Sequence, residues 1–228
     1  ILLLAGSIHF NDTLPAEKRG KTKWIDVYHG LITVLHNRSY VCYILQSGFA
    51  QSVLFANIAS SPFIMQQHYG FSPFMFSAAL VSIAIGIAAA SAAKFRHPEQ
   101  ALYTGSIGMV LASVCLFIAF YSNCSFWVYE TLLIGLLLML GLTFTASNTL
   151  AMDSARSNAG IASALLGALG FAFGGLVSPL VGLGNILIST GLVFIIGSLG
   201  SFICTLRALN RKFSLAKILK TTQSSMNL

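Results

Sequence analysis

The chain has 228 residues and is too apolar and too poor in charge to be a water-soluble domain. Hydrophobic residues make up 56% of it, charged residues 8%, and the mean hydropathy is +0.80, whereas soluble domains carry about 25% charged residues. The net charge of +7 is dispersed among connecting segments instead of forming one basic stripe. This pattern excludes a nucleic-acid-binding surface and indicates contact with anionic lipid headgroups.

The amino-terminal part predicts a short stub followed by a cytoplasmic loop. Residues 1–8 are apolar but too few to span a bilayer, so we interpret them as the tail of a preceding helix and the chain as a fragment. Residues 9–39 form the predicted loop. Within it, 24–37 has an amphipathic pattern at helical spacing, with Trp24 and Tyr28 on its apolar side. Such a helix either lies in the inner membrane interface or packs as a connector under the bundle.

Six stretches are long enough to cross the hydrocarbon, which takes about 20 residues of helix. They are residues 40–61, 73–93, 101–121, 127–150, 159–179 and 187–206. Threaded through a bilayer, they place every Lys and Arg on one side, including those of the basic tail 207–228. Because basic loops stay in the cytoplasm, both ends are predicted to be cytoplasmic, and the fold is predicted to be an all-α transmembrane bundle.

Small residues recur every four positions in two of these stretches, which lets helix backbones approach closely in lipid. The glycines predicted to pack against neighbouring helices are Gly86, Gly167, Gly170 and Gly174. Gly105 is followed four residues later by Met109, so we expect its replacement to be milder.

Motifs for enzymatic chemistry are missing. There is no phosphate-binding GxxxxGK[ST] sequence, no HExxH and no paired-cysteine metal spacing. All five histidines fall in connections, so a membrane-embedded hydrolase has no base within its spans. The sequence therefore predicts no enzyme, no cofactor and no metal, and four free cysteines.

A few polar residues do lie inside the spans, where such groups usually face the bundle interior or a water-filled cavity. Gln46 and Asn57 share one face of the first span, and either substrate contact or interhelical hydrogen bonding explains them. Glu130 and Asn148 are five turns apart on one stripe of the fourth span. Glu130 is a possible ionisable site, or an interfacial carboxylate near Trp127.

Several segments together resemble the Bcr/CflA drug-efflux branch of the major facilitator superfamily, over nearly the whole chain. The matching segments are residues 12–19, 46–63, 68–73 and 159–167, the last following Asn148. Ile161 and Asp153 depart from the expected pattern, which puts the substrate range in doubt.

This resemblance implies the carboxy-terminal half of a twelve-helix transporter that exports small drug-like molecules in exchange for protons across the bacterial inner membrane. The substrate would bind between two six-helix halves, and the acidic coupling residues would lie in the missing amino-terminal half. It implies four cavity candidates, Gln46, Phe49, Asn57 and Asn148. The alternative is a six-helix membrane scaffold that never transports, and six further upstream spans would decide for the transporter.

Overall fold

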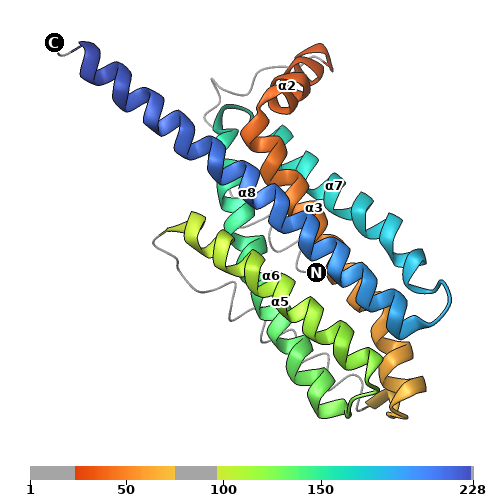
Figure 1. Ribbon diagram of the computed structural model, residues 1–228. Helices are drawn as coiled ribbons and strands as arrows, with labels where there is room; N and C mark the ends of the chain where they lie inside the picture. Colours follow the sequence, from red (N-terminus) through yellow and green to blue (C-terminus); the bar gives the residue numbers. More distant parts are fainter. Residues whose placement is uncertain (1–23, 75–96, 227–228) are drawn as a thin grey trace, which may run out of the picture.

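The computed structural model describes residues 24–74 and 97–226, with side chains up to Asn210 (Figure 1). Every regular element in these ranges is a helix, which confirms the prediction of an all-α protein, and five helical segments are long and apolar enough to cross a membrane. The stub 1–8, the motif 12–19 and nearly all of the predicted span 73–93 lie outside the described residues. The helices are α2 (Trp24–His36), α3 (Arg38–Pro62), η2 (Phe63–His68), α5 (Pro98–Tyr121), α6 (Phe126–Ser154), η3 (Arg156–Asn158), α7 (Ala159–Val181) and α8 (Ile186–Met226).

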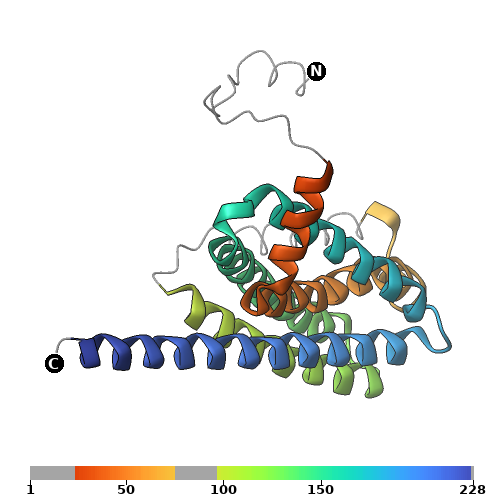
Figure 2. The ribbon, with the colours of Figure 1, turned by 90° about the horizontal axis from the view of Figure 1, so that it is seen from above.

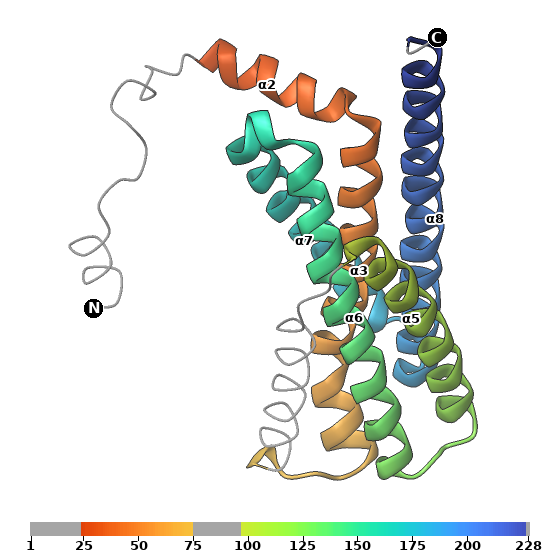
Figure 3. The same ribbon diagram turned by 90° about the vertical axis from the view of Figure 1, so that its left-hand side faces the viewer.

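Helix α3 is the central helix of the described bundle. It packs against α6, α7 and α8, while α5 packs against α6 and α8 (Figures 1 and 3). Two apolar clusters lie along it, one around Met109, Leu133 and Phe194 and the other around Tyr40 and Leu102. The central position of α3 explains why its polar residues face several different partners.

The first span continues further than residues 40–61. Pro62 does not end the helix: the chain passes through it into the π-helical segment η2, so the helical run extends from Arg38 to His68. A proline removes one backbone donor, and a wider helical turn accommodates such a change locally. Pro179 is likewise inside α7 instead of marking its end.

Asn37 fixes the corner between α2 and α3. Its Oδ1 accepts hydrogen bonds from the backbone N–H groups of Ser39 (3.1 Å) and Tyr40 (3.3 Å), which caps α3. Its Nδ2 donates to the Ser154 carbonyl oxygen at the end of α6 (2.7 Å). One side chain therefore joins three helices at this end of the bundle.

Helix α2 lies across α7 and points away from the side occupied by α8 (Figures 2 and 3). Only one edge of it is covered, because Val34 is buried and Gly30 abuts Ile161 of α7. The apolar face predicted from the sequence remains exposed, with Trp24 at 91% and Tyr28 at 60%. The described bundle therefore covers α2 only along its Gly30–Val34 edge.

Tight turns and an aromatic cluster form the end of the bundle opposite the Asn37 corner. The turns use left-handed backbone at Asn123 (φ 47°) and Gly184 (φ 79°). Tyr69 stacks on Tyr129 at 5.7 Å, and its hydroxyl donates to the Cys124 carbonyl oxygen at 3.1 Å. Burial raises the pKa of the Tyr69 phenol, and the hydrogen bond to Cys124 adds to the shift. These contacts join the end of η2 to the α5–α6 turn.

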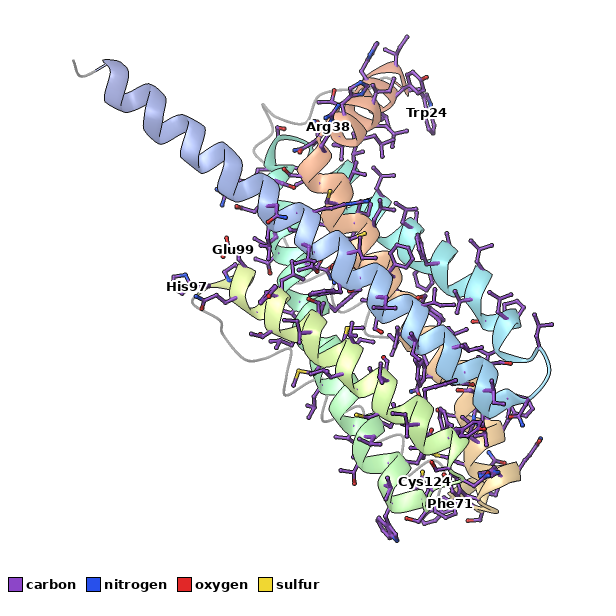
Figure 4. The ribbon with its side chains drawn as sticks, viewed as in Figure 1. Trp24, Arg38, Phe71, His97, Glu99 and Cys124 are labelled. Atoms are coloured by element: carbon purple, nitrogen blue, oxygen red, sulfur yellow. The ribbon has the colours of Figure 1, made fainter. Side chains whose placement is uncertain are left out.

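Helix α8 is much longer than the predicted span, because it continues to Met226 through the segment interpreted as a basic tail. Its membrane-length part ends at Asn210. Arg38, Glu99 and His97 gather at one end, which we call the basic end, whereas Phe71 and Cys124 lie at the other (Figure 4). Arg156 also lies at the basic end and pairs with Asp153.

We expect the basic end to be cytoplasmic, since Lys and Arg are retained on that side of the membrane. The test uses two single-cysteine variants, Asn123→Cys and Ser157→Cys, in a protein whose four natural cysteines are replaced by serine. An impermeant maleimide added to intact cells should label the variant at 123 and spare the one at 157. Labelling of the variant at 157 but not of the one at 123 would show that the basic end faces the outside of the cell.

Candidate substrate-facing site

A strip of α3 remains accessible between α6 and α7. At about 100° per residue, the residues of this strip lie within about 80° of each other around the axis of α3. Gln51 and Phe55 are half-buried, and Ile58 is 54% exposed. The strip consists of Gln51, Phe55 and Ile58, and the buried Ser47 lies one turn before them on the same side of α3. With Asn148 of α6 and Phe171 of α7 beside it, we call this strip the open face.

The α7 side of the open face is aromatic and closely packed. The rings of Phe55 and Phe171 meet edge to face at 5.9 Å, and Phe171 is 69% exposed. Gln51 lies against Gly170, where an added Cβ would be 3.4 Å from its side chain. The Gln51 Oε1 atom is buried and has no hydrogen-bond partner in the part of the chain that the structure describes. The half-buried Gln51 amide and the Phe55–Phe171 pair bring polar and aromatic groups together, a combination typical of sites that bind small organic molecules.

Asn148 forms the α6 side of the open face. It is half-buried, and its Oδ1 accepts a hydrogen bond from the Ser47 hydroxyl at 3.3 Å. The neighbouring Ser147 donates to the Tyr43 carbonyl oxygen at 3.0 Å, which anchors α6 to α3 at this height. Asn148 is thus held at the edge of the open face by the helix that carries Gln51.

The structure does not bring the other three cavity candidates to the open face. Gln46 is fully buried and donates through Nε2 to the Ser201 hydroxyl of α8 at 2.9 Å. Asn57 is also buried and accepts a hydrogen bond from Ser61 of its own helix at 3.1 Å. Gln46 therefore makes an interhelical hydrogen bond, as one of the two sequence interpretations proposed, although its buried Oε1 has no partner among the described residues. Asn57 bonds to a residue of its own helix instead.

Phe49 lies on the far side of α3. Its ring meets Phe173 at 5.0 Å and helps to line an apolar crevice of about 220 Å³ between α7 and α8, near Val193 and Gly197. This crevice is separated from the open face by α3 itself. Phe49 therefore contributes to packing of α7 and α8 on α3.

Glu130 lies near the start of α6, at the end of the bundle opposite the basic end. It is only 8% exposed although Trp127, three residues earlier, is 77% exposed, and its Oε2 atom has no hydrogen-bond partner among the described residues. An unpaired carboxylate is costly to bury, so this position argues against a simple interfacial carboxylate. Its role as an ionisable site stays a prediction.

The predicted packing glycines differ in their surroundings. Gly170 and Gly174 both face α3, and an added Cβ at Gly174 would lie 2.6 Å from Cγ of the Phe55 ring. At Gly167 an added Cβ would meet no atom of the described residues within 4 Å. Gly86 lies outside the described residues. Gly105, expected to be tolerant, abuts α6 so closely that a Cβ would overlap the Thr143 hydroxyl, so that expectation is wrong.

Sequence reasoning missed Gln51, Phe55 and Phe171. Their one indication in the sequence is that Gln51 and Phe55 share a helix face with Ser47 while glycines recur on α7. In the part of the chain that the structure describes, no group of three His, Cys, Asp or Glu residues could hold a metal ion.

Comparison with known proteins places these helices in a family. Residues 1–179 match the model of the Major Facilitator Superfamily. The chain is also 30% identical over 191 residues to YdgK of Bacillus subtilis (strain 168), an uncharacterised MFS-type transporter. That alignment covers 80% of this chain and 47% of the relative, so the chain spans about half the relative's length.

The family match covers most of the chain and agrees with a bundle of five membrane-length helices in the described residues. It also agrees with the resemblance seen in the sequence at the level of the superfamily. The chain belongs to the major facilitator superfamily of membrane transporters.

Proposed function

We propose that the open face is one wall of a substrate path and that this bundle is half of a proton-coupled exporter of small organic molecules. The observation that carries the proposal is the combination of Gln51, Asn148 and the Phe55–Phe171 pair on an accessible surface between spanning helices. Amide groups supply hydrogen bonds and aromatic rings supply apolar contact, which suits drug-like molecules.

The finer assignment rests on the sequence motifs. Gln46 to Phe49 and the segment 159–167 favour a Bcr/CflA-type drug antiporter of a bacterial inner membrane, with protons as the coupling ion. The second wall would come from the other six-helix half that the family resemblance implies; the alignment with the relative covers 47% of that protein. Alternating access then proceeds by rocking of the two halves around the shared site.

The first test asks whether the bundle alone transports. The 228-residue chain in proteoliposomes with an imposed proton gradient is expected to give no flux of a lipophilic fluorescent drug above that of empty vesicles, because one wall of the path is missing. The full-length transporter prepared in the same way should give flux that an uncoupler abolishes.

Flux from the 228-residue chain alone would mean that two copies complete the path, and the half-transporter architecture would be wrong. Full-length flux that survives the uncoupler would remove protons as the coupling ion. A folded full-length protein that moves none of a broad panel of organic molecules would favour the scaffold alternative.

A further inference from the structure

Glu130 of α6 is a buried carboxyl group that the proposed substrate path does not use. Its side chain is 8% exposed, and its Oε2 atom lacks a hydrogen-bond partner among the described residues. The side chains one or two turns away on the same face of α6 are the half-buried Phe126 and the buried Leu133 and Leu137. This face is otherwise apolar, and an ionised carboxylate without a partner is costly to bury there.

The spanning segments supply no positive charge to neutralise Glu130. No Lys or Arg occurs in residues 39–93, 97–155 or 157–206. Residues 75–93 lie outside the described residues, but their sequence contains no Lys, Arg or His, so they bring no positive charge wherever they lie. At the start of α6, the backbone N–H groups of Val128 and Tyr129 already donate to the Ser125 carbonyl oxygen at 3.1 and 3.2 Å.

The end of the bundle opposite the basic end carries few titratable groups besides Glu130. We call it the aromatic end, because an aromatic cluster forms it: Tyr69, Phe71, Phe126 and Tyr129. Of the helices packed against α6, α7 has no titratable side chain and α3 has none after Tyr43. The other titratable side chains toward this end are Cys115, Tyr121, Cys124, His68, Tyr69 and Tyr129. Among these, only His68 can be positively charged, and it is exposed, with its ring against Tyr69 at 4.7 Å.

We propose that Glu130 is a proton-binding site of this half of the transporter. The carboxyl group holds a proton while the aromatic end is closed, as it is in this structure. When that end opens, water reaches the side chain, the O–H bond breaks, and the proton passes to water and leaves a hydrated carboxylate. Low pH therefore favours the closed end, and rising pH favours the open one.

This site is additional to the acidic coupling residues that the resemblance implies in the other half. Proton binding at Glu130 does not depend on which molecule is transported. Its use in transport rests on the proposed exchange of organic molecules for protons. The experiments below measure protonation and opening without a substrate, so their failure is distinct from failure of the flux tests.

Infrared spectroscopy of the 228-residue chain in lipid vesicles tests whether Glu130 is protonated. Near neutral pH the chain should show the C=O stretch of a protonated carboxyl group, which exposed carboxylates lack at this pH. Glu130→Gln should remove this band. Asp153→Asn is the matched control and should leave the band unchanged, because Asp153 is exposed and paired with Arg156.

The band can also be assigned without replacing Glu130, in case that variant does not fold. The chain has three glutamates, Glu17, Glu99 and Glu130. In a protein with Glu17→Gln and Glu99→Gln, carbon-13 labelling of glutamate should move the band to lower frequency. Absence of the band from the wild-type chain, or a band that neither Glu130→Gln nor the labelling changes, would overturn the proposal.

Cysteine labelling tests the link between Glu130 and opening. In the protein without natural cysteines, Leu133→Cys places a thiol at a buried position one turn from Glu130, and Asn123→Cys is an exposed reference at the same end. The labelling rate at 133 relative to that at 123 should rise with pH by at most about tenfold per pH unit, since one proton is released. Glu130→Gln should flatten this rise. A relative rate that does not change with pH, or that rises equally in Glu130→Gln, would show that opening does not depend on Glu130.

Discussion

Gly105→Ala is expected to destabilise the bundle by roughly 1–3 kcal/mol, the usual range for overpacking a tight contact. A Cβ at this position would overlap the Thr143 hydroxyl and lie 3.2 Å from the Met139 carbonyl oxygen. The backbone of α6 cannot rotate aside as a side chain can, so α5 and α6 must move apart. Lost helix contact is not restored by a hydrophobic force in lipid. Gly105→Leu should abolish folded protein.

Gly167→Ala is the matched control, since it adds the same methyl group to a helix where no atom lies within 4 Å. Alanine favours helix over glycine by about 1 kcal/mol, so this variant should be as stable as the wild type or slightly more stable. Thermal unfolding in detergent, followed by the monodisperse fraction, measures both. Equal stability of the two variants would contradict the close contact between α5 and α6.

Asn148→Leu should lower drug export by the full-length transporter at least tenfold while leaving the folded yield near normal. Its side chain is half-buried at the edge of the open face and makes one hydrogen bond, to Ser47. Leucine has a similar size and keeps the helix, but it removes the amide that we place on the substrate path. Transport rate divided by folded protein in the membrane is the quantity to measure.

Asn57→Leu provides the contrast, because the same substitution is made at a buried site. Asn57 is 3% exposed and accepts hydrogen bonds from Ser61, so its loss should act on yield, with export per folded molecule nearly unchanged. If Asn148→Leu exported normally, Asn148 would not line the path. If it misfolded as Asn57→Leu does, its role would be structural.

The spanning helices could be predicted because the length and hydropathy of each segment indicate a span without knowledge of the helices that pack against it. The residues at which these helices end could not be predicted. Proline is typical of a helix end, yet at Pro62 the chain continues as a π-helix to His68. The C-terminal part of α8 is basic and too polar to predict a membrane span, but it continues the helix of the last span to Met226.

The site was harder to predict because α3 has polar residues on more than one side. Gln46 and Gln51 are five positions apart and so point about 140° away from each other. The sequence does not say which direction leads to α8 and which to the gap between α6 and α7. Phe49 illustrates the same difficulty, since its ring faces Phe173 behind α3. Only the positions of the neighbouring helices separate a packing residue from a surface one.

The corner at Asn37 bears on how such proteins can recombine during evolution. Its contacts with Ser154 and with the start of α3, and the contact of Gly30 with Ile161, make α2 part of the same structural unit as the spans. A recombination point between Trp24 and Arg38 would combine α2 of one parent protein with the ends of α6 and α7 of another. When two related genes exchange this half of the protein, the corner at Asn37 is kept only if the point of exchange lies before Trp24. The segment that must be exchanged as one piece therefore includes α2 as well as the spanning helices.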